Sequence, residues 1–305
     1  MLFADRFVYI HEPKTGGTFV TYALTQLHGG LTEVRPSGYV HPAIRRRFPT
    51  ASFRLERRAA SASATGTKYG PLCSWNDHGT CSEIPGPFRA RQIFATMRNP
   101  LQKYVSGYLF AWWKRPEYLP LYRDAIPDFA RRFSGFPDLS FQEYMELIHA
   151  SWTVPGNRDL YSGTGIGFQT ERFLHFYFRV PWLRRGSKHD ISALVDRVDA
   201  DYVKSNRYLE DMFSVRFLKT GSLNEELCDF LLETGYDQAD VEFVQTLRHV
   251  VPVGGADVEL VDRATSHDWA SFYTAELVEI VRRKDNLLFT LFPEFEVSAE
   301  KAETP

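Results

Sequence analysis

Residues 7–18 read FVYIHEPKTGGT, an apolar run that leads directly into two glycines and then into a helical pattern. The run Phe7–Ile10 is typical of a buried strand, and apolar residues recur at helical spacing from Phe19 to Leu27. Glycines let the backbone bring its N–H groups close to an anion, and the helix that follows adds the positive end of its dipole. Together with the charge of Lys14, this segment predicts a site for a phosphate or sulfate group.

The order of residues distinguishes this loop from the one found in nucleotide triphosphatases. Their loop reads G-x-x-x-x-G-K-[ST], with the lysine after the second glycine. Here Lys14 precedes both Gly16 and Gly17, and no glycine lies upstream of it. The sequence therefore does not match the usual ATP- or GTP-binding loop.

A second strand and helix follow at Gln92–Met97 and from Pro100 onward, since proline favours the first turn of a helix. Arg98 lies directly after this strand, and Ser106 lies eight residues later on the helix, where both can face one phosphate. The planar fork of an arginine donates two N–H bonds to a phosphate and keeps its charge. The simpler alternatives are a surface ion pair for Arg98 and, for Ser106, a hydroxyl bonded to its own helix.

The segment PKTGGT (residues 13–18), taken with Arg98-Asn99-Pro100 and Ser106, resembles the sulfotransferases that use 3'-phosphoadenosine 5'-phosphosulfate (PAPS). The resemblance is closest to the branch that contains the heparan 2-O-sulfotransferases and related bacterial proteins. In that family the first motif holds the 5'-phosphosulfate and the second holds the 3'-phosphate. Carried onto this chain, the resemblance implies that the cofactor is bound by Lys14, Thr15, Gly16, Gly17, Thr18, Arg98 and Ser106.

Sulfuryl transfer builds negative charge on the oxygen between sulfate and phosphate, so we expect Lys14 to stabilise that oxygen. The N–H groups of residues 15–18, with the Thr15 and Thr18 hydroxyls, are expected to hold the other oxygens, and no metal is needed. An alcohol acceptor also requires a base. His78 is the first candidate, because Asp77-His78-Gly79 resembles a segment upstream of the second motif in the 2-O-sulfotransferase relatives; an ordinary loop histidine is the alternative.

Three further residues near these motifs are weighed for the same site. His41 is the rival base, because some relatives have a histidine just before a basic helix and His41 precedes three arginines, Arg45–Arg47. Glu83 is a weaker carboxylate candidate. His11 is expected to pack against the loop and support it.

We expect the acceptor to be a hydroxyl group of a carbohydrate, and the second product to be adenosine 3',5'-bisphosphate (PAP). A tyrosyl peptide or a small molecule is the alternative acceptor. A P-loop-type phosphotransferase or kinase is the alternative enzyme, and a catalytically silent nucleotide-binding protein is the third hypothesis.

The segment from His41 to Gly70 carries a net charge of +6 with histidine neutral. This charge suits an acidic acceptor, or simply a solvated face.

The composition bounds the class of protein. The chain has 305 residues, 44% of them hydrophobic, and a net charge of −2, so nothing global indicates nucleic acid or an anionic membrane as partner. Charged residues at the N-terminus and the lack of an apolar run of about 18 residues predict a cytoplasmic protein without a membrane span. Three cysteines fit a reducing compartment, and Cys73 and Cys81 beside His78 match no tight zinc spacing.

We therefore expect a single domain over residues 1–305 with an α/β fold. It consists of a P-loop-like parallel sheet flanked by helices on both faces and a helix-rich second half. Residues 36–87 are expected to be an irregular excursion, and residues from about 295 to 305 a C-terminal tail. The segment Phe272–Phe292 has the periodicity of one long helix, and Arg263, Ser266 and His267 precede it where relatives have a cofactor-closing loop.

Overall fold

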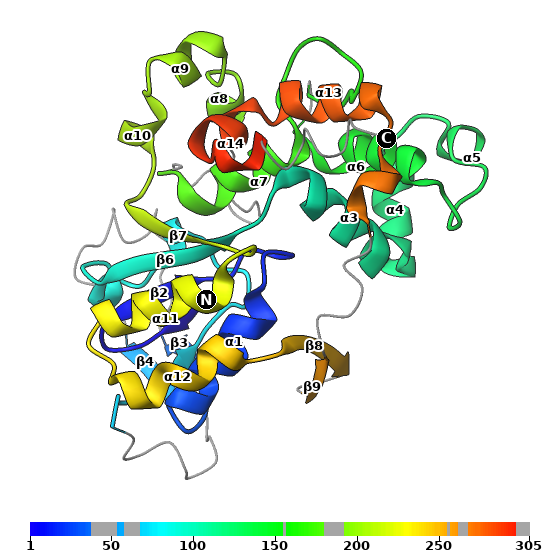
Figure 1. Cartoon of the computed structure of the whole chain (residues 1–305). Helices are drawn as coiled ribbons and strands as arrows, with labels where there is room; N and C mark the ends of the chain where they lie inside the picture. The colour runs from blue at the N-terminus through cyan, green and yellow to red at the C-terminus, as the bar shows by residue number, and fades with distance from the viewer. Residues whose placement is uncertain are drawn as a thin grey trace. The chain divides into compact units, whose positions relative to one another are not determined.

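The computed structural model describes residues 1–37, 54–57, 68–154, 157–179, 192–254, 257–261 and 268–296. These residues form two compact units, each built from separate segments of the chain (Figure 1). Unit 1 comprises the described parts of Met1–Arg98 and Phe213–Ala264, and unit 2 most of the remainder. The expectation of a single domain over residues 1–305 stays a prediction.

Unit 1 contains a sheet of seven strands in the order β4-β3-β5-β1-β2-β6-β7. Strand β2 pairs in parallel with β6, β6 pairs in parallel with β7, and β3 pairs in parallel with β5, whereas β1 is antiparallel to both of its neighbours and β4 to β3. The predicted α/β fold is confirmed, with a sheet that is mixed rather than wholly parallel. The strands are β1 (Leu2–Phe3), β2 (Phe7–Ile10), β3 (Thr32–Ser37), β4 (Arg54–Arg57), β5 (Cys73–Ser74), β6 (Gln92–Met97) and β7 (Val215–Lys219).

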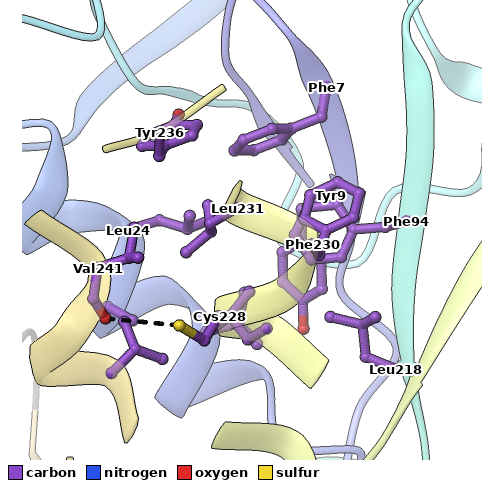
Figure 2. Close-up of a cluster of buried hydrophobic side chains, with 14 of the residues drawn as sticks. Phe7, Tyr9, Leu24, Phe94, Leu218, Cys228, Phe230, Leu231, Tyr236 and Val241 are labelled. Carbon is purple, nitrogen blue, oxygen red and sulfur yellow. Dashed lines mark hydrogen bonds between the residues drawn. The ribbon is translucent and has the colours of Figure 1, made fainter. Parts of the chain in front are cut away.

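Three helices of unit 1 lie on one face of this sheet (Figure 1): α1 (Gly17–Leu27), α11 (Leu223–Glu233) and α12 (Gln238–Thr246). Their apolar side chains meet those of β2 and β6 in the cluster of Figure 2. The ring of Phe230 on α11 lies 4.2 Å from that of Phe94 and 5.6 Å from that of Phe7, measured between centroids. Burying one such ring stabilises the fold by about 2–3 kcal/mol, so this face anchors the two strands that precede the site.

The opposite face of the central strands is also covered, because Val8, Ile10, Ala95 and Met97 are fully buried. This explains why both strands read as continuous apolar runs rather than as alternating ones. A separate hairpin pairs β8 (His249–Gly254) with β9 (Asp257–Val261). Within the expected excursion of residues 36–87 the structure has β4, β5 and two 3₁₀ turns, η1 (Cys81–Glu83) and η2 (Gly86–Phe88), so its described parts are not irregular throughout.

Unit 2 is helical, and the second half of the chain is rich in helices in both units, which confirms the expected helix-rich second half. Helix α6 of unit 2 begins with a capping box, in which the Ser140 hydroxyl accepts from the N–H of Glu143 and the Glu143 carboxylate accepts from the N–H of Ser140. The helices are α3 (Pro100–Phe110), α4 (Leu119–Ala125), α5 (Phe129–Arg132), α6 (Phe141–Trp152), α7 (Phe168–Tyr177), α8 (Ser192–Val195), α9 (Ala200–Lys204), α10 (Tyr208–Asp211), α13 (Ala275–Lys284) and α14 (Asn286–Leu291), with 3₁₀ turns η3 (Trp112–Lys114), η4 (Pro116–Tyr118) and η5 (Trp269–Phe272).

The expectation of one long helix over Phe272–Phe292 is wrong, because the helical structure is interrupted at Asp285, between α13 and α14. The Asp285 carboxylate is fully buried and accepts hydrogen bonds from the N–H and hydroxyl of Thr170 and from the Tyr104 hydroxyl. Burial raises the pKa of Asp285 to about 6. The hydrogen bonds offset the cost of burying this carboxyl group, and they fix the break in place.

Within the described residues, no helix has both the length and the apolar character needed to cross a membrane. The same residues contain no group of three or more His, Cys, Asp or Glu side chains arranged to hold a metal ion.

Candidate functional site

Three parallel strands of unit 1 end at the same edge of the sheet, and each leads into a turn at that edge. Strand β2 leads into the loop His11–Gly16, β6 leads to Arg98, and β7 leads to Thr220. The N–H of Thr220 donates to the carbonyl of Met97 at 2.9 Å. A Cβ added to Gly16 would lie 3.4 Å from the Thr220 side chain, so the first and third turns touch. In open α/β sheets, ligands bind outside this edge.

The backbone of the first loop alternates between left-handed and other conformations from residue to residue. Lys14 has φ 71° and Gly16 has φ 92°, both in the left-handed region, with Thr15 between them outside it. Such alternation makes successive N–H groups converge on one anion. A lysine held in this region is strained, which is typical of functional loops.

Helix α1 begins at Gly17 without a side-chain cap, because its N-cap residue is Gly16. The first N–H groups of a helix have no acceptor within the helix, and here no acidic side chain lies in the first turn either. The N–H groups at Gly17 and Thr18 are therefore suited to an anion from outside the helix.

The Thr15 hydroxyl holds the loop rather than facing a ligand. It donates to the Glu12 carbonyl at 2.8 Å, and its oxygen lies 2.9 Å from the Thr96 hydroxyl, which in turn lies 3.1 Å from the Tyr9 hydroxyl. Thr15, Thr96 and Glu12 are fully buried. The expected contact of the Thr15 hydroxyl with an anion is therefore not supported, and the backbone N–H is what this residue can offer.

Sequence reasoning did not single out Thr96. A hydroxyl inside an otherwise apolar run, Ile93–Met97, is the signal that could have found it, because a buried polar group needs a partner.

Lys14 and Arg98 bring two positive charges to this edge. Burial first, and then the charge of Arg98, lower the pKa of Lys14 to about 8. Burial also lowers the pKa of Arg98. Like charges repel each other, so the two cations carry an unfavourable electrostatic free energy in the free protein. An anion bound beside them would reduce it.

The structure brings His78 to the same loop. Its ring contacts that of His11 edge to face, with centroids 5.1 Å apart, and its Nδ1 lies 3.3 Å from the His11 carbonyl oxygen. His78 is exposed, whereas the ring of His11 packs directly against Gly17. The predicted base and the predicted supporting histidine are therefore neighbours.

The turn that carries His78 is well anchored. Asn76 has φ 50°, and the N–H of Gly79 donates to its carbonyl at 2.8 Å. The Met1 amino nitrogen donates to the carbonyls of Asn76 and Asp77. Glu83, the weaker carboxylate candidate, accepts from the N–H of Thr80 at 2.8 Å and caps the turn η1. The local fold thus gives Glu83 a structural task.

The other predicted residues are not joined to this site by the structure. Ser106 is partly buried on α3 in unit 2, whereas Arg98 belongs to unit 1. The binding of one phosphate by both residues therefore stays a prediction. His41, Arg45–Arg47 and the segment Arg263–His267 lie outside the described residues.

We expect Gly17→Ala to damage the loop. A Cβ at Gly17 would lie 1.8 Å from the Nε2 of His11, so that ring must move, whereas alanine would otherwise favour a helix. We expect a loss of about 1–3 kcal/mol in the free energy of unfolding, measured by denaturant titration, and weaker binding of PAP. Gly221→Ala is the matched control, because nothing lies within 4 Å of a Cβ there. Wild-type PAP affinity in Gly17→Ala would contradict this packing.

Comparisons with known proteins show a similarity of structure. No protein-family model and no curated protein matches the chain. Among solved structures, the chain is similar to the mouse sulfotransferase SULT7A1 complexed with PAP, with a TM-score of 0.41 and 12% sequence identity over 98% of this chain and 88% of the mouse chain. A similarity of this size does not assign the chain to a family, so function is inferred below from the site.

Proposed function

We propose that this protein transfers a sulfuryl group from PAPS to a hydroxyl group of a carbohydrate and releases PAP. The observation that carries the proposal is that Lys14 and Arg98 follow adjacent parallel strands and so share the sheet edge where the uncapped helix α1 begins. This arrangement fits a ligand with several negative charges. The residue order of PKTGGT favours PAPS over a nucleoside triphosphate.

Each end of such a ligand has a partner in the proposal. The N–H groups of residues 15–18, with the Thr18 hydroxyl, bind the 5'-phosphosulfate. Arg98, with Ser106, binds the 3'-phosphate. The turns that carry Lys14 and Arg98 leave adjacent parallel strands, which supports binding at one edge by both.

The donor supplies an activated sulfuryl group, and the residues of the chain supply charge and a base. Lys14 donates to the oxygen that links sulfate to phosphate and stabilises the charge that develops there. His78 accepts the proton of the attacking hydroxyl group while the new bond to sulfur forms and the old one breaks. The exposed position of His78 supports this role, because the acceptor must reach it.

Thermal unfolding with two ligands tests the proposal. PAP at about 100 times its dissociation constant should stabilise the protein by about 2.7 kcal/mol, because it binds the folded state alone. ATP with magnesium should have little effect. Equal stabilisation by both ligands would favour a phosphotransferase. No stabilisation by either would contradict both the sulfotransferase and the phosphotransferase, and would favour a catalytically silent protein.

The acceptor requires a separate experiment. Transfer of radiolabelled sulfate from PAPS should be measured on a panel of glycans, phenols and lipids. We expect transfer to glycans. Transfer to phenols alone would replace the carbohydrate acceptor with a tyrosyl peptide or a small aromatic molecule.

A further inference from the structure

His11 contacts both the glycine turn of the loop and the proposed base. Atoms of its ring occupy the space where a Cβ of Gly17 would be, the closest at 1.8 Å. The same ring contacts that of His78 at an interplanar angle of 69°. One side chain therefore touches both parts of the site that the proposed reaction uses.

The main chain of His11 restricts the tautomer of His78. The Nδ1 of His78 lies 3.3 Å from the carbonyl oxygen of His11, and a carbonyl oxygen can only accept a hydrogen bond. Nδ1 must then donate, so in the neutral ring it carries the proton. The lone pair is left on Nε2, the nitrogen that would take a proton from an acceptor.

The ring of His11 is neutral and held in place. Burial, followed by repulsion from His78 and the Met1 amino group when these are protonated, lowers its pKa to about 3. The ring stacks on Tyr9 at an interplanar angle of 16°, and the Tyr9 hydroxyl lies 3.1 Å from that of Thr96 on the next strand. Because the ring is uncharged, it can affect His78 only through packing contacts and not through a charge.

We propose that His11 is a positioning residue for sulfuryl transfer: its ring orients His78 against the glycine turn, and its carbonyl holds the proton of His78 on Nδ1, leaving Nε2 as the base. This inference rests on the proposed function, in which His78 is the base. His11 itself touches neither donor nor acceptor in this scheme. The geometry makes its effect on the rate pass through His78.

The first test uses the protein without ligand. Nitrogen-15 NMR of the histidine rings reports which nitrogen of the neutral His78 carries the proton. We expect Nδ1 in the wild type and in His11→Phe, which keeps a flat ring, and a mixture of tautomers in His11→Ala. A wild-type His78 that carries its proton on Nε2 overturns the inference, whatever the enzyme's activity.

The second test is a double-mutant cycle on kcat. His11→Ala should lower kcat by about 10- to 100-fold, as losses of orienting residues do. In the His78→Ala background the same change should alter kcat by less than about twofold, because its effect passes through the missing ring. The matched control is His28→Ala, which removes another buried histidine of unit 1, bonded to Gly70 and Tyr236. It should lower stability and leave kcat nearly unchanged.

The outcomes separate the two proposals. An active wild type in which His11→Ala costs the same factor with and without His78 overturns the positioning role and leaves the sulfotransferase intact. A wild type that is not stabilised by PAP and transfers no sulfate overturns the proposed function and, with it, the catalytic meaning of this inference. Recovery of kcat in His11→Phe supports a role for the ring rather than for its nitrogens.

Discussion

Lys14→Ala is expected to abolish sulfuryl transfer, with kcat at least about 10²- to 10³-fold lower than in the wild type. The proposed role of the Lys14 ammonium group is to stabilise the oxygen that leaves with the phosphate, where no other described group is assigned that role. Because the same charge also attracts the donor in its ground state, PAP affinity should fall as well. Rates on the best acceptor of the panel and calorimetric titration with PAP measure the two effects separately.

The controls for Lys14 are chosen to separate charge from geometry. Lys14→Arg keeps the charge on a planar group that cannot act as a compact donor, so it should recover PAP affinity better than kcat. Lys68→Ala removes an exposed lysine of the same unit that pairs with Asp237 and Asp240, and should change neither value. Undiminished kcat in Lys14→Ala would remove the lysine from the chemistry.

The lowered pKa of Lys14 gives this prediction a pH dependence. Burial and the charge of Arg98 place that pKa at about 8 in the free protein, and a bound anion would raise it, since the anion favours the protonated form. The contribution of Lys14 to PAP affinity should therefore be constant below about pH 8, and the affinity should fall by up to about tenfold per pH unit above it. In Lys14→Arg the guanidinium keeps its proton, so the affinity should lose this component of its pH dependence.

Local patterns in the sequence were sufficient for the elements that bear the site. The apolar runs Phe7–Ile10 and Gln92–Met97 form β2 and β6 as expected, and Pro100 begins α3. The local sequence specifies these elements, because a short continuous apolar run flanked by turn-forming residues favours a buried strand over other structures. The loop between strand and helix follows from its glycines.

The parts that the sequence did not predict depend on residues distant in the chain. Strands β3 and β5 pair through Thr32 with Cys73, a register that local pattern cannot specify. Asp285 breaks the last helix because Thr170 and Tyr104 hydrogen-bond its carboxylate. In the same way, the pairing of Thr15 with Thr96 turns an expected ligand contact into internal support.

His78→Ala is expected to slow the chemical step by about 10²- to 10⁴-fold, the range for removal of a general base. PAP affinity should stay within about twofold of wild type, because His78 is assigned to the acceptor's proton and not to the donor's phosphates. Single-turnover rates on the panel's best acceptor, together with PAP titration, test this split. A mutation that damaged the whole loop would lower both quantities, as we expect for Gly17→Ala.

Neighbouring and rival residues make the His78 result decisive. Asp77→Ala alters an exposed residue of the same turn, and its main-chain contact with Met1 survives the change, so kcat should fall much less than in His78→Ala. His41→Ala tests the rival base directly. Turnover that survives in His78→Ala and is lost in His41→Ala would move the base to His41. Because the proposed positioning role of His11 acts through His78, that outcome would also remove the catalytic reason for the contact between the two rings.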